Sequence, residues 1–300
     1  MLVYAKLLLT AFFWGGTFIA GRVVSRSMDP YAAAFLRFAI ASVFLLGLIL
    51  IKEGKLVSIS LKQLFFVILL GMTGVFAYNI FFFSGLHTVV AGRASIIIAL
   101  NPIAISILSS IIFKEKLTVL KLFGILISVT GALVVITFGD LSSIFSDPIG
   151  KGELFIFGCV VSWVSYSLIG KMVMSNLSPL VSVAYSALAG AIALSVPAFT
   201  RGMADVIIGY SAEEWISLFY LGFFGTVLGF YWYYQALNTV GPMKSSVFIN
   251  FVPVSAIILA MVLLNEPVTV SLLVGAALVL SGVLLTNFSG LLVTWLKKRL

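Results

Sequence analysis

Side chains that could do chemistry are few in this 300-residue chain, which has a single histidine, His87, and a single cysteine, Cys159. A catalytic centre needs converging acids, bases or metal ligands, and a disulfide or thiolate cluster needs more than one cysteine. We therefore expect no catalytic residues, no metal site and no cofactor. The sequence predicts that the chain is not an enzyme.

Polar and aromatic side chains gather instead inside long apolar stretches of the chain. Side chains that hydrogen-bond and stack would suit a small amphipathic solute, such as an amino acid with an apolar side chain. The same residue types also join helices to one another or anchor them at the membrane surface, so both interpretations stay open. The candidate substrate-binding residues are Trp14, Tyr78, Asn79, Ser95, Asn101, Trp163, Ser245, Ser246 and Asn250.

Arg37 is the one cation placed well inside an apolar stretch, roughly 7 residues or about 10 Å from its start. An arginine at the centre of a bilayer costs about 3 kcal/mol on insertion scales. It must therefore face a wet cavity, find a partner or extend outward. Either it contacts a substrate carboxylate, or it has a structural role at the helix end. No Asp or Glu lies mid-stretch, which disfavours coupling to protons.

Two prolines, Pro102 and Pro253, each lie about nine residues into an apolar stretch. Proline removes a backbone donor and kinks a helix, and the freed polar groups are tolerated in a membrane only inside protein or beside water. We expect Pro102 and Pro253 to act as hinge or gating residues beside a binding site.

The elements that must position these residues are membrane helices. Hydrophobic residues make up 62% of the chain and charged residues 9%, whereas soluble domains average about 25% charged. Apolar runs long enough to span a bilayer predict an all-α membrane protein with ten transmembrane helices. These lie near residues 4–24, 30–51, 62–85, 92–113, 120–138, 152–172, 179–198, 215–235, 243–264 and 270–295.

The two halves of the chain repeat each other. Pro102 and Pro253 are 151 residues apart, as are Gly74 and Gly225, and Trp14 and Trp163 are 149 apart. This pattern predicts a first five-helix repeat at 1–138, a linker at 139–151 and a second repeat at 152–300. Because each repeat has an odd number of helices, the second must be inverted.

Charge placement orients the chain. Lysines and arginines are concentrated in the segments that share a side with the N-terminus, and acidic residues in the others. The positive-inside rule then places both termini in the cytoplasm. The basic excess reflects topology and lipid contact, so we expect a small-molecule substrate and a bilayer as partners and no nucleic acid. Monomer and homodimer both stay open. The expected location is the cytoplasmic (inner) membrane, crossed many times.

The segment from Phe13 to Phe18, the Asn101-Pro102 and Val252-Pro253 pairs, and an E-x-x-T after each pair resemble the drug/metabolite transporter superfamily, in its ten-helix EamA-type branch. The resemblance covers nearly the whole chain, and YddG-type aromatic amino acid exporters are similar. It implies a secondary transporter that exports small metabolites by alternating access, with amino acids, aromatic ones included, as the expected cargo. Drugs, sugars or nucleobases are the alternative cargo, and a membrane scaffold or lipid-handling protein is the alternative class.

Overall fold

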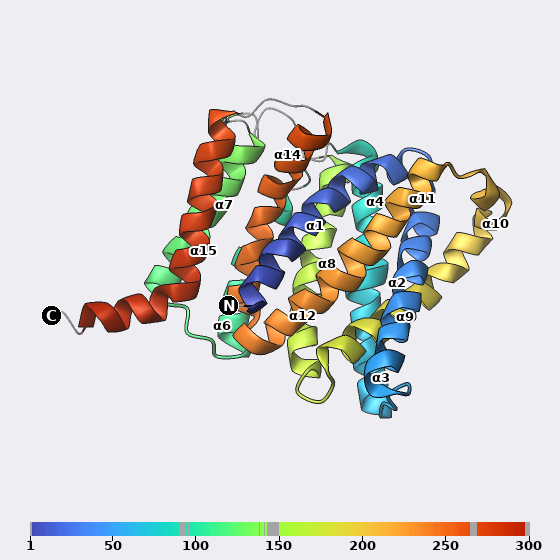
Figure 1. Cartoon of the computed structure of the whole chain (residues 1–300), viewed down its shortest axis with the longest axis horizontal. Coiled ribbons are helices and arrows are strands. Elements are labelled where there is room, and N and C mark those ends of the chain that lie inside the picture. Colours follow the sequence, from blue (N-terminus) through green and yellow to red (C-terminus); the bar gives the residue numbers. More distant parts are fainter. Residues whose placement is uncertain are drawn as a thin grey trace.

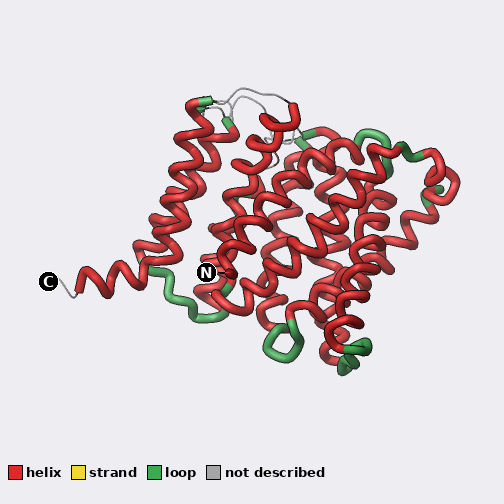
Figure 2. The backbone as a smooth tube through the Cα atoms, viewed as in Figure 1, coloured by secondary structure: helices red, strands yellow, loops and turns green. Residues whose placement is uncertain are grey.

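The computed structural model describes residues 2–89, 94, 97–137, 139–140, 142, 150–264 and 269–297, and side chains along most of these ranges. Every regular element in them is helical (Figure 2), which confirms the predicted all-α class for the described residues. Long rods lie side by side in one bundle, and α15 (Val270–Lys297) stands at its edge against α7 (Val119–Ile136) (Figure 1).

Six helical rods in the described ranges are long and apolar enough to cross a membrane. Four of them are single helices, two from each half, and the other two are composite rods that change helix type midway. The rods are α1 (Leu2–Ser25), α2 (Pro30–Glu53), α3 (Leu61–Leu70) with η1 (Gly71–Ala77) and α4 (Tyr78–Thr88), α8 (Lys151–Val173), α9 (Pro179–Thr200), and α11 (Ala212–Tyr220) with η4 (Leu221–Leu228) and α12 (Gly229–Val240).

The helices begin where short polar side chains can take up free backbone donors. Asp29 directly precedes α2, and its side chain accepts a hydrogen bond from the backbone amide of Tyr31. Pro30 is the first residue of that helix, where its fixed φ suits the helical backbone. Ser60 forms a capping box with Gln63, and Ser211 forms one with Glu214. These caps fix the ends of the rods and thereby the depth of the side chains along them.

In the part of the chain that the structure describes, each half contains one stretch of π-helix, η1 in the first and η4 in the second. The two stretches begin 150 residues apart and carry the repeated glycines of the sequence. Such stretches are rare and occur often at functional sites. Here η1 packs on α9 and η4 packs on α2, so each half's π-helix contacts the second helix of the other half.

Other contacts between the halves come in matching pairs. α1 packs on α12, as α8 packs on α4, and α2 packs on α9 while α7 packs on α15. The core of the bundle is therefore shared by the two halves of the chain rather than divided between them.

Two helices start in the interior instead of at an end of the bundle. A turn at Ala99 and Leu100 precedes α6 (Asn101–Ile112), and a 3₁₀ stretch, η5 (Val247–Asn250), follows α13 (Pro242–Ser246) and leads into α14 (Phe251–Leu264). Non-helical backbone at this depth is tolerated only where protein or water satisfies it.

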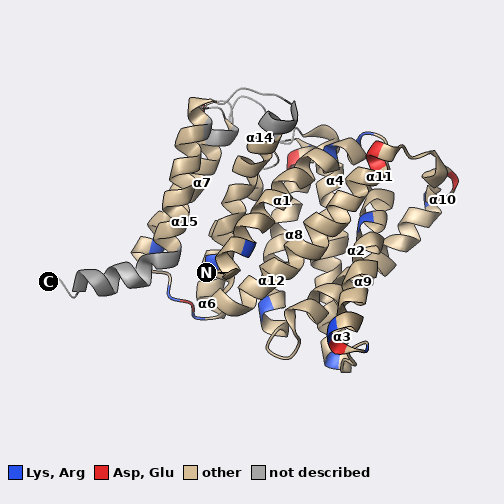
Figure 3. Ribbon diagram, viewed as in Figure 1, with Lys and Arg blue, Asp and Glu red and all other residues tan. Residues whose placement is uncertain are grey.

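Charge is distributed unevenly along the rods. Lysines and arginines gather toward the end of the bundle that holds the N-terminus, whereas most acidic residues in view lie toward the opposite end (Figure 3). Lys6 donates to Gln235 at 2.8 Å, which joins α1 to α12, and Arg201 pairs with Asp29 at 3.5 Å.

Candidate functional site

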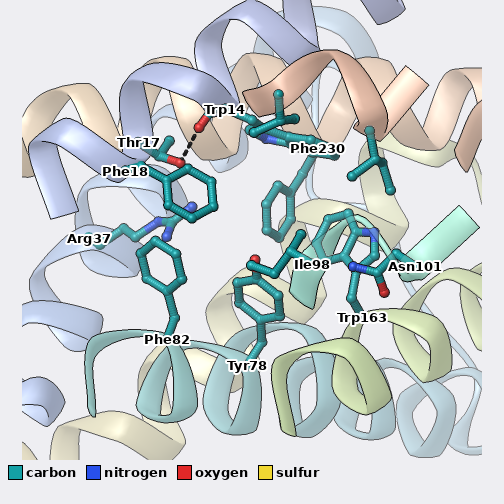
Figure 4. A pocket seen from close by; sticks show the side chains of 12 residues that line it. Trp14, Thr17, Phe18, Arg37, Tyr78, Phe82, Ile98, Asn101, Trp163 and Phe230 are labelled. Carbon is teal, nitrogen blue, oxygen red and sulfur yellow. Dashed lines mark hydrogen bonds between the residues drawn. The ribbon is translucent and has the colours of Figure 1, made fainter. Parts of the chain in front are cut away.

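A cavity lies in the interior of the bundle, between elements of the two halves. It has about 440 Å³ of atom-free space, a figure that includes open solvent at its mouth. Its walls come from α1, α2, α4, α6, α8, α12 and the η5–α14 junction (Figure 4). The lining side chains are Trp14, Thr17, Phe18, Arg37, Tyr78, Phe82, Ile98, Asn101, Trp163, Phe230, Ile249 and Val252.

Aromatic rings form much of the wall. Trp14 and Trp163 meet edge to face with ring centroids 5.1 Å apart, and Phe230 lies 5.1 Å from Trp163 and 6.2 Å from Trp14. Tyr78 stacks on Phe82 at 5.9 Å from the other side of the cavity. Edge-to-face pairs of this kind fix each ring in place, so the cavity offers a rigid set of flat apolar faces.

Among the described residues of the lining, Arg37 is the only charged side chain, and it is buried, with 3% of its surface exposed. Its Nε donates to Thr226 Oγ1 at 3.0 Å and its Nη1 donates to Asn79 Oδ1 at 2.9 Å. The guanidinium also lies 5.3 Å from the ring centre of Phe38. These neutral partners hold the guanidinium in place without cancelling its charge.

The local sequence explains that arrangement. The Thr226 hydroxyl donates to the Leu221 carbonyl within the π-helix, which leaves its oxygen free to accept from Arg37. Asn79 anchors its own amide on the Val75 carbonyl at 2.8 Å, which turns its oxygen toward Arg37. Both π-helical stretches therefore contribute to placing one cation.

Two polar atoms of the lining have no hydrogen-bond partner. The Oδ1 atom of Asn101 is buried and unpaired, and so is Nε1 of Trp163, whose ring lies 5.4 Å from that of Tyr233 without a well-formed hydrogen bond between them. Buried polar groups are nearly always satisfied. An orphan acceptor and an orphan donor at one end of a cavity mark a place where a ligand can bind.

The structure brings together five of the residues that the sequence indicated: Trp14, Arg37, Tyr78, Asn101 and Trp163 all line the cavity. Arg37 faces the cavity instead of extending to the membrane surface.

Four further candidates lie away from the cavity. Asn79 does not line the cavity, but it accepts a hydrogen bond from Arg37, which does. Ser245 and Ser246 are buried and donate to backbone carbonyls of their own turn, at 2.8 and 3.1 Å. Asn250 donates to Ser128 at 2.8 Å and so joins η5 to α7. Ser95 is outside the described residues.

The two prolines lie where helices restart. Pro102 is the second residue of α6 and Pro253 the third of α14, and both are buried. Pro102 therefore follows a turn and Pro253 follows a 3₁₀ stretch, each near the start of an α-helix and not in the middle of one. Their residues Asn101 and Val252, directly before the prolines, both line the cavity.

Sequence reasoning missed seven lining residues, namely Thr17, Phe18, Phe82, Ile98, Phe230, Ile249 and Val252. Helical spacing could have found some of them. Thr17 and Phe18 follow Trp14 by three and four residues, and Phe82 follows Tyr78 by four, so each shares a face with a residue that was indicated.

At the basic end of the bundle, Glu115 links the halves. Its carboxylate accepts the amide of Met243, at the start of α13. Partial burial raises the pKa of the Glu115 carboxyl, while the Met243 amide and the charges of Lys121, Lys171 and Lys244 act in the opposite direction. The equivalent Glu266 of the second half lies outside the described residues.

Comparison with known proteins identifies relatives along almost the whole chain. The EamA-like transporter family matches residues 1–137 and again 150–288. The uncharacterized transporter YyaM of Bacillus subtilis is 31% identical over 282 residues, covering 94% of this chain and 92% of that protein. An uncharacterized transporter of Archaeoglobus fulgidus is 32% identical, covering 92% and 95%.

A relative with a more specific name is the probable terminal-alkyne amino-acid exporter of Streptantibioticus cattleyicolor, which is 28% identical and covers 94% of this chain and 92% of its own. A solved crystal structure superimposes with a TM-score of 0.74 at 20% identity, covering 95% of this chain and 97% of that one. That likeness shows a shared fold.

Proposed function

This chain belongs to the EamA-like transporter family, and on that premise we propose that it exports amino acids with large apolar or aromatic side chains across the cytoplasmic membrane. The family is one of multi-pass membrane transporters of small molecules. The cargo and direction are our inference from the cavity. One relative named as a probable amino-acid exporter supports them.

The observation that carries the proposal is a buried, unneutralised arginine in an aromatic-walled cavity between the two halves. Arg37 presents a guanidinium that can bind a carboxylate. The rings of Trp14, Trp163 and Phe230 present flat apolar faces beside it. A small molecule with a carboxylate and a large apolar group satisfies both features of the site.

For topology, we propose ten membrane-spanning helices in two inverted repeats, 1–138 and 152–300, joined by the linker 139–151, with both termini in the cytoplasm. The matched contacts between the halves, the paired π-helical stretches and the basic end of the bundle beside the N-terminus support this arrangement. Inverted repeats place the substrate site where they meet, near the middle of the membrane, which is where this cavity lies relative to the rods.

For mechanism, we propose alternating access with Pro102 and Pro253 as hinges. Each proline starts the helix that contributes a cavity-lining residue directly before it. Rocking α6 or α14 about its proline would therefore move Asn101 or Val252 and open the cavity to one side. The described lining includes no carboxylate, so the transport step needs no proton on the cavity wall.

The test is flux of labelled amino acids in proteoliposomes, with and without an imposed proton gradient. We expect aromatic and large neutral amino acids to exchange without the gradient, and Trp163→Ala to reduce that flux while the protein still folds. Flux that occurs only with a gradient would overturn the uncoupled mechanism. No flux of any amino acid by folded protein would overturn the cargo assignment.

A further inference from the structure

The cavity has two different ends. Arg37 lies at one end, and Asn101 and Trp163 lie at the other, with Tyr78 and Phe230 between them (Figure 4). A ligand of this cavity must satisfy both ends at once.

At the first end, a guanidinium has five N–H groups, and two of those of Arg37 are used, by Thr226 and Asn79. No carboxylate of the described residues pairs with it. A buried charge without a counter-ion is strongly unfavourable. The remaining donors therefore call for an anion, and the fork geometry of the guanidinium suits a carboxylate.

At the second end, Asn101 Oδ1 is an acceptor with 1% of its residue exposed and no partner. It calls for a hydrogen-bond donor on the ligand. Since the carboxylate is held at the opposite end, this donor cannot be a group on the same carbon as the carboxylate. It must lie across the ring system, on the far edge of the molecule.

Between the ends, the rings of Phe230, Tyr78 and Trp14 line the cavity, and such rings suit stacking or edge contacts with an aromatic ligand. Ring faces are poor hydrogen-bond partners, so apart from the Tyr78 hydroxyl the polar groups available to a ligand lie toward the two ends.

We propose that the cavity binds aromatic carboxylates in one orientation, with the carboxylate on Arg37 and a donor on the far ring edge on Asn101. Among aromatic amino acids this selects the phenol of tyrosine and the indole N–H of tryptophan over phenylalanine, and Asn101 is the residue that sets this selectivity. This assignment rests on the proposed function, because it takes the cavity to be the transport site.

The experiment measures competition against labelled tyrosine in counterflow, with phenylalanine and O-methyltyrosine as competitors. O-methyltyrosine keeps the ring and an oxygen but cannot donate. We expect both to compete roughly tenfold less well than unlabelled tyrosine, the usual worth of one neutral hydrogen bond. Asn101→Leu should remove this difference. Ser106→Ala is the matched control, because Ser106 is a buried residue of the same helix with an unpartnered hydroxyl and does not line the cavity.

The carboxylate end is tested with two analogues that share the phenol. 3-(4-Hydroxyphenyl)propionate keeps the carboxylate, and tyramine lacks it. We expect only the acid to compete in the unaltered protein, and Arg37→Gln to abolish that difference. Equal competition by tyramine would overturn the assignment of Arg37.

The two proposals fail in different ways. Tyrosine flux with equal competition by O-methyltyrosine, a result that needs no variant, would overturn the orientation and leave export standing. If no amino acid is transported, thermal shifts still test the site in folded protein. A larger stabilisation by 3-(4-hydroxyphenyl)propionate than by 3-phenylpropionate, lost in Asn101→Leu, would support the two-ended site while export fails. No stabilisation by either acid would overturn the site.

Discussion

The two halves of the molecule place different residues at equivalent positions around the same backbone. In the first half, Arg37 faces the cavity. Its counterpart 149 residues later is Ser186, which is buried at 0% exposure beside Tyr166. Tyr166 in turn is the counterpart of Thr17, a small residue of the cavity wall. A small residue beside a long cation in one half is therefore matched by a large ring beside a small hydroxyl in the other.

This exchange decides where the cavity lies. Around Tyr166 the space is filled by tilted rings, with the centroid of Tyr234 at 4.8 Å and that of Phe230 at 5.6 Å. The hydroxyl of Tyr234 donates to the Tyr166 carbonyl at 2.9 Å. A duplicated backbone would offer two equivalent pockets, and the second half fills its copy. The lesson is that duplication provides the frame, and divergence at a few positions provides a single, polarised site.

The largest expected effect comes from removing the Tyr166 ring, which fills the second half's copy of the pocket. Tyr166→Ala removes a fully buried ring, and truncating a buried aromatic residue typically costs about 3–5 kcal/mol. Its counterpart Thr17→Ala removes little volume from a wall that already borders a cavity, and should cost about 1 kcal/mol or less. The check is the unfolding free energy of both variants in detergent. Equal losses would show that the two halves are packed alike and would break the comparison.

The next effect comes from the residue that holds the arginine. Thr226 is matched in the first half by Val75, 151 residues earlier. Thr226→Val removes the acceptor for Arg37 Nε, a hydrogen bond to a charged group worth about 1.5–3 kcal/mol. We expect an increase of KM for tyrosine of roughly 10- to 100-fold with little change in expression. Ser186→Ala is the control and should leave KM unchanged. An unaltered KM in Thr226→Val would mean that Arg37 is held by other contacts.

Much of the fold and part of the candidate site could be predicted from the sequence. Apolar runs predicted the all-α class, the lack of catalytic groups predicted that the chain is not an enzyme, and the resemblance predicted a transporter. Family membership confirms the last two predictions. Trp14 and Trp163 were indicated because they are matched, and both line the cavity. Residues 4–24 and 30–51 were also close to α1 and α2 as observed.

Other features depend on packing that one-dimensional spacing does not report. No simple periodicity of apolar residues predicts the π-helical stretches. Whether Ser245 and Ser246 face a cavity or their own backbone depends on which face of α13 is buried, and both were buried against protein. Phe230 was missed because it directly precedes a run of aromatic residues, Tyr231 to Tyr234, whose spacing does not tell which ring faces the interior. Only the crossing of α12 with α8 brings it against Trp163.

A smaller effect is expected from the matched glycines Gly74 and Gly225. A Cβ on Gly74 would lie 2.2 Å from the Tyr166 ring, whereas a Cβ on Gly225 would lie 2.7 Å from the terminal methyl of Thr17. The Tyr166 ring is enclosed and cannot move, so Gly74→Ala should lower the unfolding free energy by about 1–3 kcal/mol through overpacking. Gly225→Ala should cost less, because Thr17 can shift toward the cavity. Thermal unfolding of both variants measures the two losses of stability. A larger loss for Gly225→Ala than for Gly74→Ala would contradict this account.

The smallest effect concerns pH and sharpens the comparison at the basic end, where the first half's Glu115 contacts the second half's α13. Burial raises the pKa of the Glu115 carboxyl above its usual 4.5, so the folded chain binds this proton more firmly than the unfolded chain does. Its contribution to stability is therefore greatest in acid, below the unfolded pKa, and declines as the pH rises through the folded pKa. Glu115→Gln keeps an oxygen for the Met243 amide and removes the titration. The melting temperature of the unaltered protein relative to Glu115→Gln should accordingly fall from pH 4.5 toward neutrality. A relative rise would mean that Lys121, Lys171 and Lys244 outweigh burial, and that this contact between the halves is held by charge and not by packing.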